Sequence, residues 1–410
     1  MARPVRFAAV LLLATSSTVL ASPPATVPTR CEERELSLDR HHTVALLEGC
    51  GGSDAGDLLW HLDRIDQLDG ELDGRFDRGS AGRGSLVYVM DTGIRADHRE
   101  FEGKEGSRVV AGIDVTAALT AGASSCSSPS RSLAPCYSTF EELFSSSHGT
   151  AVASIIGGTH VGVAPEVSLV SVRIMNERGL TTTATYMQAL EEIIRHAFLP
   201  EAPAVRTAVI NISGWVLERL SAAAFTSPVV RFAAVERKIR EMVEGVDAAG
   251  KPDPDGKRFL FVVAANNVDG GCGPDGVVDR FPAILGPWID GVITVGGMTA
   301  ANTWWDGSCR GAVEVLAPAQ GIFSATITGP DHYGGRQPNH RSGTSFAAPI
   351  ISGIAARLLA ERPDLTPAQL ETWIRSTPSR IIDPKPAFAD GRVAYVPSLA
   401  PTPVASHLPR

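Results

Sequence analysis

Three polar residues, far apart in the chain, have the side chains that nucleophilic catalysis needs. Asp91 directly follows the apolar run LVYVM, His148 opens the stretch HGTAVAS, and Ser345 lies within HRSGTSFAAPIISG. A serine hydroxyl is a weak nucleophile until an imidazole takes its proton, and a carboxylate holds that imidazole in the correct tautomer. The three residue types therefore predict a nucleophile, a general base and a residue that orients the base.

Each of the three also has a purely structural explanation. Ser345 is a good N-cap for the apolar run after it, Asp91 before Thr-Gly suits a turn, and His148 suits a helix cap or the surface. The order Asp-His-Ser disfavours an α/β-hydrolase, in which serine comes first and histidine last. The G-x-S-x-G elbow of that class is also missed by one residue, since Ala347 replaces its second glycine.

Two other motifs do not support the functions that they formally match. The loop Asp91-Thr92-Gly93 is typical of aspartic proteases, but these need two such loops to share a proton, and the chain has one. Residues 271–276 formally match the G-x-G-x-x-G dinucleotide fingerprint, but they contain Pro274 and open no predicted helix.

The segments around these residues alternate between strand and helix patterns. Nearly continuous apolar runs, typical of strands buried on both faces of a parallel sheet, are LVYVM (86–90), SLVSVRIM (168–175), AVIN (208–211), FLFVVAA (259–265) and GVITVGG (291–297). Helical patterns occupy 148–156, 183–198, 229–243 and 345–360, and a capping box at 366–369 begins another helix. The alternation predicts an α/β fold with a mostly parallel sheet and helices on both faces. Active sites of such sheets lie beyond the carboxyl ends of strands, where Asp91 stands.

Composition limits the class of protein. The chain has 410 residues, of which 44% are hydrophobic and 20% charged, as expected for a soluble globular protein with a large core. The net charge of −8, without a basic block, gives nucleic-acid binding no support.

The N-terminus predicts export. Arg3 and Arg6 precede the apolar run 7–14, and Val19-Leu20-Ala21 offers the small residues of a cleavage site. The run is too short to span a bilayer, so we expect a signal peptide over 1–21 and no stable membrane insertion.

Export permits disulfides, and the rest of the chain has an even number of cysteines. Proximity in the sequence favours the pairs Cys31–Cys50, Cys126–Cys136 and Cys272–Cys309. The chain contains no C-x-x-C or H-E-x-x-H pattern, so we assign no metal ligands.

The motifs VMDTGI, HGTAVAS and SGTSFAAP together resemble those of the subtilisin-like serine proteases, and the proteinase K-like branch is the most similar. The resemblance runs roughly from Trp60 to Arg380. It implies a three-layer subtilisin-like fold and a secreted endopeptidase that hydrolyses polypeptides through an acyl-enzyme and requires no cofactor for its chemistry. We expect a monomer.

The resemblance also assigns roles to single residues. Asp91 would orient His148, which would act as general base and then general acid, and Ser345 would form the acyl-enzyme. Small neighbours of Ser345 and the N–H groups at the start of its helix would favour the oxyanion, with Pro349 in the first turn. The VVAANN segment matches the one that supplies the oxyanion side chain, which falls on Asn267.

The residue before the oxyanion donor departs from the family, which has glycine where this chain has Asn266. Asparagine tolerates φ > 0 better than most side chains, so we expect Asn266 in a left-handed conformation and Asn267 aimed at the oxyanion. The rival register makes Asn266 the donor. Ser213 and Gly214 match the strand along which an extended peptide would lie, but Trp215 replaces a smaller residue, so side-chain preference does not carry over.

The resemblance divides the chain into a signal peptide (1–21), a short leader in place of the usual pro-domain (22–57), a peptidase domain (58–396) and a Pro-rich tail (397–410). Two segments, 114–147 and 217–257, look like insertions. The Asp/Gly-rich loop 269–279 suits either structural calcium or simple solubility. The alternative function is a catalytically silent binding protein with a protease fold.

Overall fold

The computed structural model describes residues 32–39, 42–48, 59–66, 72, 76, 80–116, 147–175, 179, 181–214, 216, 232–269, 272–273, 276–334 and 341–376, the first two ranges as backbone only. The predicted signal peptide and tail lie outside these residues, as do Trp215, both cysteines of the proposed pair Cys31–Cys50 and both of the pair Cys126–Cys136. The predicted division of the chain into domains therefore stays a prediction.

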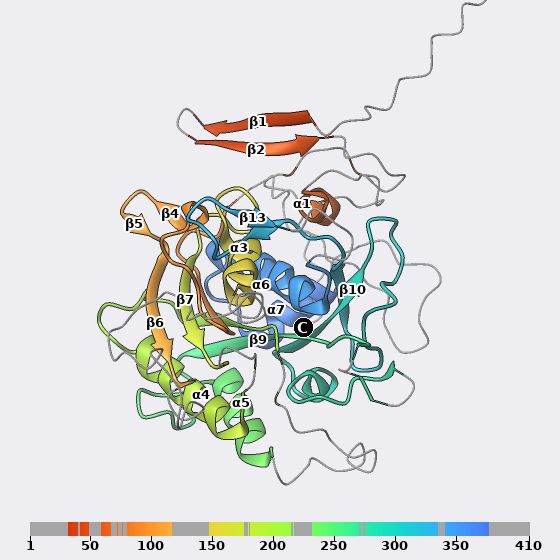
Figure 1. The fold of residues 1–410 in the computed structure, drawn as a ribbon. Helices are drawn as coiled ribbons and strands as arrows, with labels where there is room; N and C mark the ends of the chain where they lie inside the picture. Colours follow the sequence, from red (N-terminus) through yellow and green to blue (C-terminus); the bar gives the residue numbers. More distant parts are fainter. Residues whose placement is uncertain are drawn as a thin grey trace, which may run out of the picture.

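A parallel seven-stranded sheet forms the centre of the molecule (Figure 1). Its strand order is β11-β10-β9-β8-β3-β7-β6. Its strands are β3 (Leu86–Asp91), β6 (Val109–Asp114), β7 (Ser168–Arg173), β8 (Thr207–Ile212), β9 (Arg258–Ala264), β10 (Val292–Met298) and β11 (Val315–Pro318). All the pairings within it are parallel. The five strands predicted from apolar runs are confirmed, and β6 and β11 are additional edge strands.

Side chains of the central strands alternate between two hydrophobic cores, which explains the continuous apolar runs. In β3, Leu86, Tyr88 and Met90 belong to one core, and Val87 and Val89 belong to the other. The first core includes residues of α4 (Thr183–Ala197) and α5 (Ala233–Glu244), and the second includes residues of α3 (His148–Gly157) and α6 (Thr344–Glu361). The molecule therefore has the predicted three layers, with helices on both faces of the sheet.

The remaining described elements are short. They are β1 (Glu32–Asp39), β2 (His42–Glu48), α1 (Trp60–Asp63), η1 (Arg64–Asp66), η2 (Arg99–Phe101), β4 (Glu102–Gly103), β5 (Gly106–Ser107), η6 (Ala283–Trp288), β12 (Ser324–Ala325), β13 (Tyr333–Gly334) and the longer α7 (Pro367–Ser376). The capping box of α7 is confirmed, because the Thr366 N–H donates to Gln369 and the Gln369 N–H donates to the Thr366 hydroxyl.

The longest helix, α6, is buried along nearly its whole length. A helix that is apolar all round belongs in a protein core, and α6 packs against β8, β9 and β10 on one face of the sheet. None of the helices in the described ranges is both long and apolar enough to cross a membrane. The sheet and α3 position the first turn of α6 and the residues in it.

Candidate active site

Asp91 and His148 form a hydrogen-bonded pair beyond the carboxyl end of β3. The Nδ1 atom of His148 lies 2.9 Å from each carboxylate oxygen of Asp91. Asp91 is fully buried, and one of its oxygens also accepts a hydrogen bond from the Thr92 N–H at 2.7 Å. Because a carboxylate can only accept, Nδ1–H donates the hydrogen bond to Asp91, and Nε2 of the neutral imidazole is then its proton acceptor.

The start of α3 lies directly against the end of β3, which places His148 beside Asp91. The Gly149 N–H donates to the Thr92 hydroxyl at 3.0 Å, which satisfies one N–H of the first helical turn. A Cβ on Gly149 would lie 2.3 Å from the Gly93 carbonyl oxygen, so only glycine fits here. The HGT sequence is therefore needed for the close approach of the two elements as well as for the imidazole.

Ser345 is the second residue of α6 and is not its N-cap, so the capping interpretation is wrong. The N-cap is Gly343, which has no side chain to bond the helix. Pro349 lies in the second turn, which corrects the expectation that it lies in the first. Proline has no N–H for the carbonyl four residues earlier, which is that of Ser345. The Ser213 hydroxyl donates to this carbonyl instead, at 2.9 Å, and so joins the end of β8 to the backbone of Ser345.

Asn267 is held beside Ser345 by Thr344. Its Oδ1 atom accepts hydrogen bonds from the Thr344 N–H at 2.9 Å and from the Thr344 hydroxyl at 3.1 Å. Because a backbone N–H can only donate, this contact fixes the orientation of the amide and leaves Nδ2 as a free donor. Asn266 has φ +76°, which confirms the predicted left-handed conformation.

Ser345 and His148 belong to helices that meet at the ring of Phe346. The ring centroids of His148 and Phe346 are 5.4 Å apart. Within the described part of the chain, Ser345 Oγ makes no hydrogen bond to His148. Such bonds are often long in unliganded sites and shorten when substrate binds.

The other two predicted contact residues, Ser213 and Gly214, lie at the end of β8. Ser213 accepts a hydrogen bond from the side-chain amide of Asn211 at 3.0 Å, which orients the hydroxyl that bonds Ser345. A Cβ on Gly214 would lie 2.0 Å from Met175 Cε, so glycine allows close packing here. Their contact with substrate stays a prediction.

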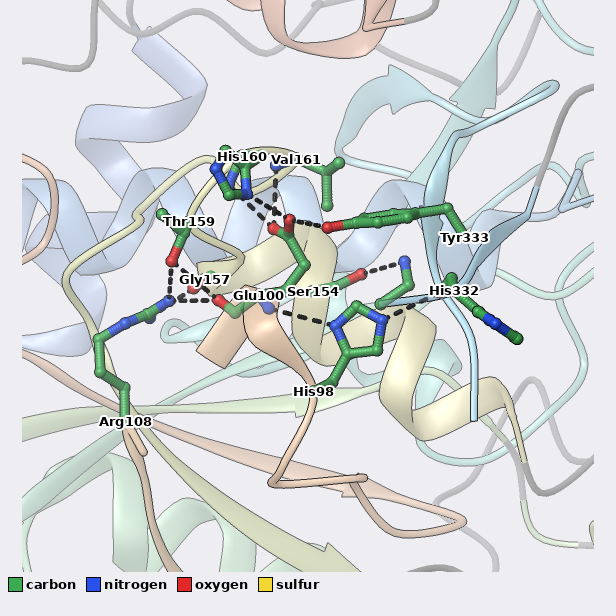
Figure 2. A network of polar contacts seen from close by, with 11 residues as sticks. His98, Glu100, Arg108, Ser154, Gly157, Thr159, His160, Val161, His332 and Tyr333 are labelled. Atoms are coloured by element: carbon green, nitrogen blue, oxygen red, sulfur yellow. Dashed lines mark hydrogen bonds and ion pairs between the residues drawn. The ribbon is translucent and has the colours of Figure 1, made fainter. Parts of the chain in front are cut away.

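Sequence reasoning missed a buried polar network around Glu100, at the far end of α3 (Figure 2). The carboxylate accepts hydrogen bonds from the His160 ring at 2.7 Å, the Tyr333 hydroxyl at 2.6 Å and the N–H groups of His160 and Val161. Burial alone would raise the pKa of Glu100, but the hydrogen bonds and charge of His160, with the bond from Tyr333, lower it to about 2. Glu100 is therefore an anion that ties β13 to the end of α3.

Three contacts attach α3 and its two ends to the segment that precedes α6. Ser147 accepts a hydrogen bond from Arg341 at 3.2 Å, and Ser154 accepts one from the Ala325 N–H at 3.0 Å. The third contact is indirect, because the Glu100 carboxylate accepts hydrogen bonds both from the Val161 N–H, in the turn after α3, and from the Tyr333 hydroxyl of β13. Only the tertiary fold brings them together, and no periodic signal in the sequence marks them.

The predicted disulfide between Cys272 and Cys309 is present, with the Cα atoms 5.5 Å apart. The Cys309 N–H also donates to the Asn266 carbonyl at 2.9 Å, so the bridge braces the segment that carries Asn267. Among the described residues, no group of three or more His, Cys, Asp or Glu side chains could hold a metal ion. Part of the loop 269–279 lies outside those residues, and calcium binding there stays a prediction.

Residues 82–393 match the model of the subtilase family, peptidase S8. The chain belongs to the subtilase family of serine proteases. An extracellular serine proteinase of Thermus sp. (strain Rt41A) is 31% identical over 76% of this chain and 59% of its own length. Alkaline serine exoprotease A of Vibrio alginolyticus is 28% identical over 78% of this chain and 47% of its own length. The chain thus spans roughly half of these curated subtilases.

A solved subtilase structure supports the same fold. A cold-adapted subtilisin-like serine proteinase is 27% identical and superposes with a TM-score of 0.58, covering 82% of this chain and 97% of the other. These similarities do not separate the proteinase K-like branch from other subtilases, so that finer assignment stays a prediction.

Proposed function

We propose that the protein is a secreted serine endopeptidase that uses Asp91, His148 and Ser345 as its catalytic triad. The observation that carries the proposal is the Asp91–His148 pair, in which the bond to Nδ1 makes Nε2 the proton acceptor of the neutral imidazole, together with Ser345 in the first turn of α6. Family membership and the orientation of Asn267 support it. We propose no cofactor for the chemistry.

The chemistry follows from these positions. His148 Nε2 removes the proton of Ser345 Oγ as that oxygen bonds to the peptide carbonyl carbon. Asn267 Nδ2 and the N–H groups at the start of α6 donate to the oxyanion, where the helix dipole adds positive charge. His148 then gives its proton to the amine as the C–N bond breaks. Water, activated by the same imidazole, releases the acyl group from Ser345.

Polypeptides are the proposed substrates, bound in an extended conformation along Ser213 and Gly214. Because such binding uses the backbone of the substrate, it accepts peptides of many different sequences. Export is supported by the signal-like N-terminus, by the Cys272–Cys309 bridge and by the extracellular relative.

A fluorophosphonate probe tests the proposal on the purified, folded protein. We expect the probe to label the protein with loss of casein hydrolysis, and we expect Ser345→Ala to abolish both. A folded protein that neither reacts with the probe nor cleaves casein would instead be the catalytically silent binding protein.

A further inference from the structure

Arg341 lies in the turn that leads to the nucleophile and has a backbone conformation that few side chains adopt. Its φ is +56°, in the left-handed region. Such a conformation costs about 1–3 kcal/mol in a non-glycine residue and is concentrated at ligand sites, where the surrounding structure enforces it. The Arg341 carbonyl accepts a hydrogen bond from the Ile322 N–H at 3.2 Å, which fixes the turn.

The guanidinium of Arg341 points to the start of the general-base helix. Its Nη2 atom donates to the Ser147 hydroxyl at 3.2 Å, and Ser147 directly precedes His148. Guanidinium has five N–H donors, and within the described residues this is its single hydrogen bond. No carboxylate in the same ranges pairs with it, although arginine is normally partnered when it is removed from water.

Arg341 keeps its charge in this position. The residue is half-buried, and burial lowers the pKa of its guanidinium to about 10, which still leaves it protonated at neutral pH. Taking an unpaired charge out of water is unfavourable, and a carboxylate that binds it in a bidentate manner offsets much of that penalty. The position is therefore suited to an anionic group of a ligand.

The contacts of the 341–345 segment place Arg341 on one particular side of the nucleophile. At one end of the segment Arg341 contacts Ser147, next to His148, and at the other end Thr344 contacts Asn267. The imidazole passes its proton to the leaving amine, so the part of the substrate after the scissile bond lies on the side of His148. The guanidinium is thus next to the leaving group rather than the acyl group.

We propose that Arg341 binds a carboxylate of the substrate on the C-terminal side of the scissile bond. This specificity rests on the proposed peptidase function. The carboxylate belongs either to an Asp or Glu side chain near the cleaved bond or to the C-terminus of the substrate. Both sources offer the planar pair of oxygens that a guanidinium binds best.

Internally quenched peptides that differ in a single group test the proposal. One series carries Glu, Gln or Lys at each of the two positions after the scissile bond. A second series compares a free C-terminal carboxylate with the amide when cleavage releases a dipeptide. The first series detects a side chain and the second a terminus, and a preference for carboxylate in either supports the proposal.

We expect kcat/KM for the carboxylate peptide to exceed that for its neutral partner by about tenfold, a typical effect for a hydrogen bond to a charged group. Arg341→Gln should bring this ratio close to one, and Arg341→Lys, which keeps the charge but loses the bidentate geometry, should keep only part of it. Arg362→Gln is the matched control, because Arg362 lies at the other end of α6 and is 54% exposed. It should leave the ratio unchanged.

Equal cleavage of carboxylate and neutral peptides by the wild type, or a preference that survives Arg341→Gln, would overturn the proposal. Binding of the same peptides to Ser345→Ala, with and without Arg341→Gln, gives the same comparison without turnover. Absence of fluorophosphonate labelling would defeat the peptidase assignment. Labelling and cleavage without any carboxylate preference would defeat only the role of Arg341.

Discussion

The hydroxyl of Ser345 and the side-chain amide of Asn267 converge on the same small space above Gly343. A Cβ placed on Gly343 would lie 3.1 Å from Ser345 Oγ and 3.2 Å from Asn267 Nδ2. The missing side chain leaves room for a carbonyl group, whose carbon can approach the hydroxyl while its oxygen approaches the amide. Glycine at this position is therefore part of the geometry of the site.

Asn267→Ala should lower kcat by about 10²–10³ with little change in KM, because the donor stabilises charge that develops only in the transition state. Asn266→Gly is the matched variant. It keeps the left-handed backbone without cost, so its kcat should be close to that of the wild type. Steady-state kinetics with one chromogenic peptide give both comparisons.

The rival register, with Asn266 as the donor, makes the opposite prediction. In that case Asn266→Gly would lose most of kcat, and Asn267→Ala would resemble the wild type. Circular dichroism of both variants checks that the fold is intact.

Ser345→Ala should lower kcat by about 10⁶, as for the related triad in which this change has been made. His148→Ala should cost about as much, and the double variant little more, since the two residues act as one unit. Any contaminating wild-type enzyme is first inactivated with fluorophosphonate, so that the turnover that remains belongs to the variant. Unchanged casein hydrolysis by Ser345→Ala would rule out this serine as the nucleophile.

Local patterns were enough to predict the parts of the site that depend on neighbouring residues. The apolar run of β3 predicted that Asp91 lies at the end of a strand, and the HGT sequence predicted that His148 begins a helix. The need for φ > 0 before Asn267 predicted the conformation of Asn266. Each of these depends on a strand end, a helix start or a backbone preference that a few residues determine.

Contacts between distant segments could not be predicted in this way. The Glu100 network joins η2, the turn after α3 and β13, and only the tertiary fold brings these together. The edge strand β6 has half-exposed residues, so it lacks a continuous apolar run. Pro349 was placed in the wrong turn because an N-cap at Ser345 would make Pro349 the fourth helical residue, whereas the observed N-cap, Gly343, makes it the sixth.

The three proposed disulfides predict that the exported protein has no free thiol. Alkylation followed by mass spectrometry of the unreduced, unfolded protein should detect no modified cysteine. Two or more alkylated cysteines would contradict at least one of the three pairs.

Reduction of the Cys272–Cys309 bridge should lower the free energy of unfolding. Its cysteines are 37 residues apart, and closing a loop of that length in the unfolded chain contributes about 4 kcal/mol in the chain-entropy model. Denaturant unfolding of Cys272→Ser with Cys309→Ser, compared with the wild type in the Ser345→Ala background, measures the effect without self-digestion. Activity should also fall, because the bridge braces the Asn267 segment. An unchanged unfolding midpoint would show that the bridge does not stabilise the fold.

A second polar cluster, made of residues outside the proposed triad, predicts how stability depends on pH. Glu314 before β11 and Glu371 on α7 are both nearly buried, and Arg375 contacts them at 2.7 Å and 2.9 Å. Burial, together with the nearby charge of Glu371, raises the pKa of Glu314 from 4.5 to about 8. The folded protein thus holds a proton on Glu314 at pH values where the unfolded chain has released it.

Stability should therefore fall as the pH rises. The contribution of Glu314 is fully present below pH 4.5, the ordinary pKa, and is lost as the pH passes through about 8. Glu314→Gln mimics the protonated carboxyl and should remove most of this decline. Glu361→Gln, at an exposed site near the end of α6, is the control and should keep it. Denaturant unfolding of these variants between pH 5 and 9, in the Ser345→Ala background, makes the comparison. If Glu314→Gln kept the full decline of the wild type, the pH dependence would have to come from other groups.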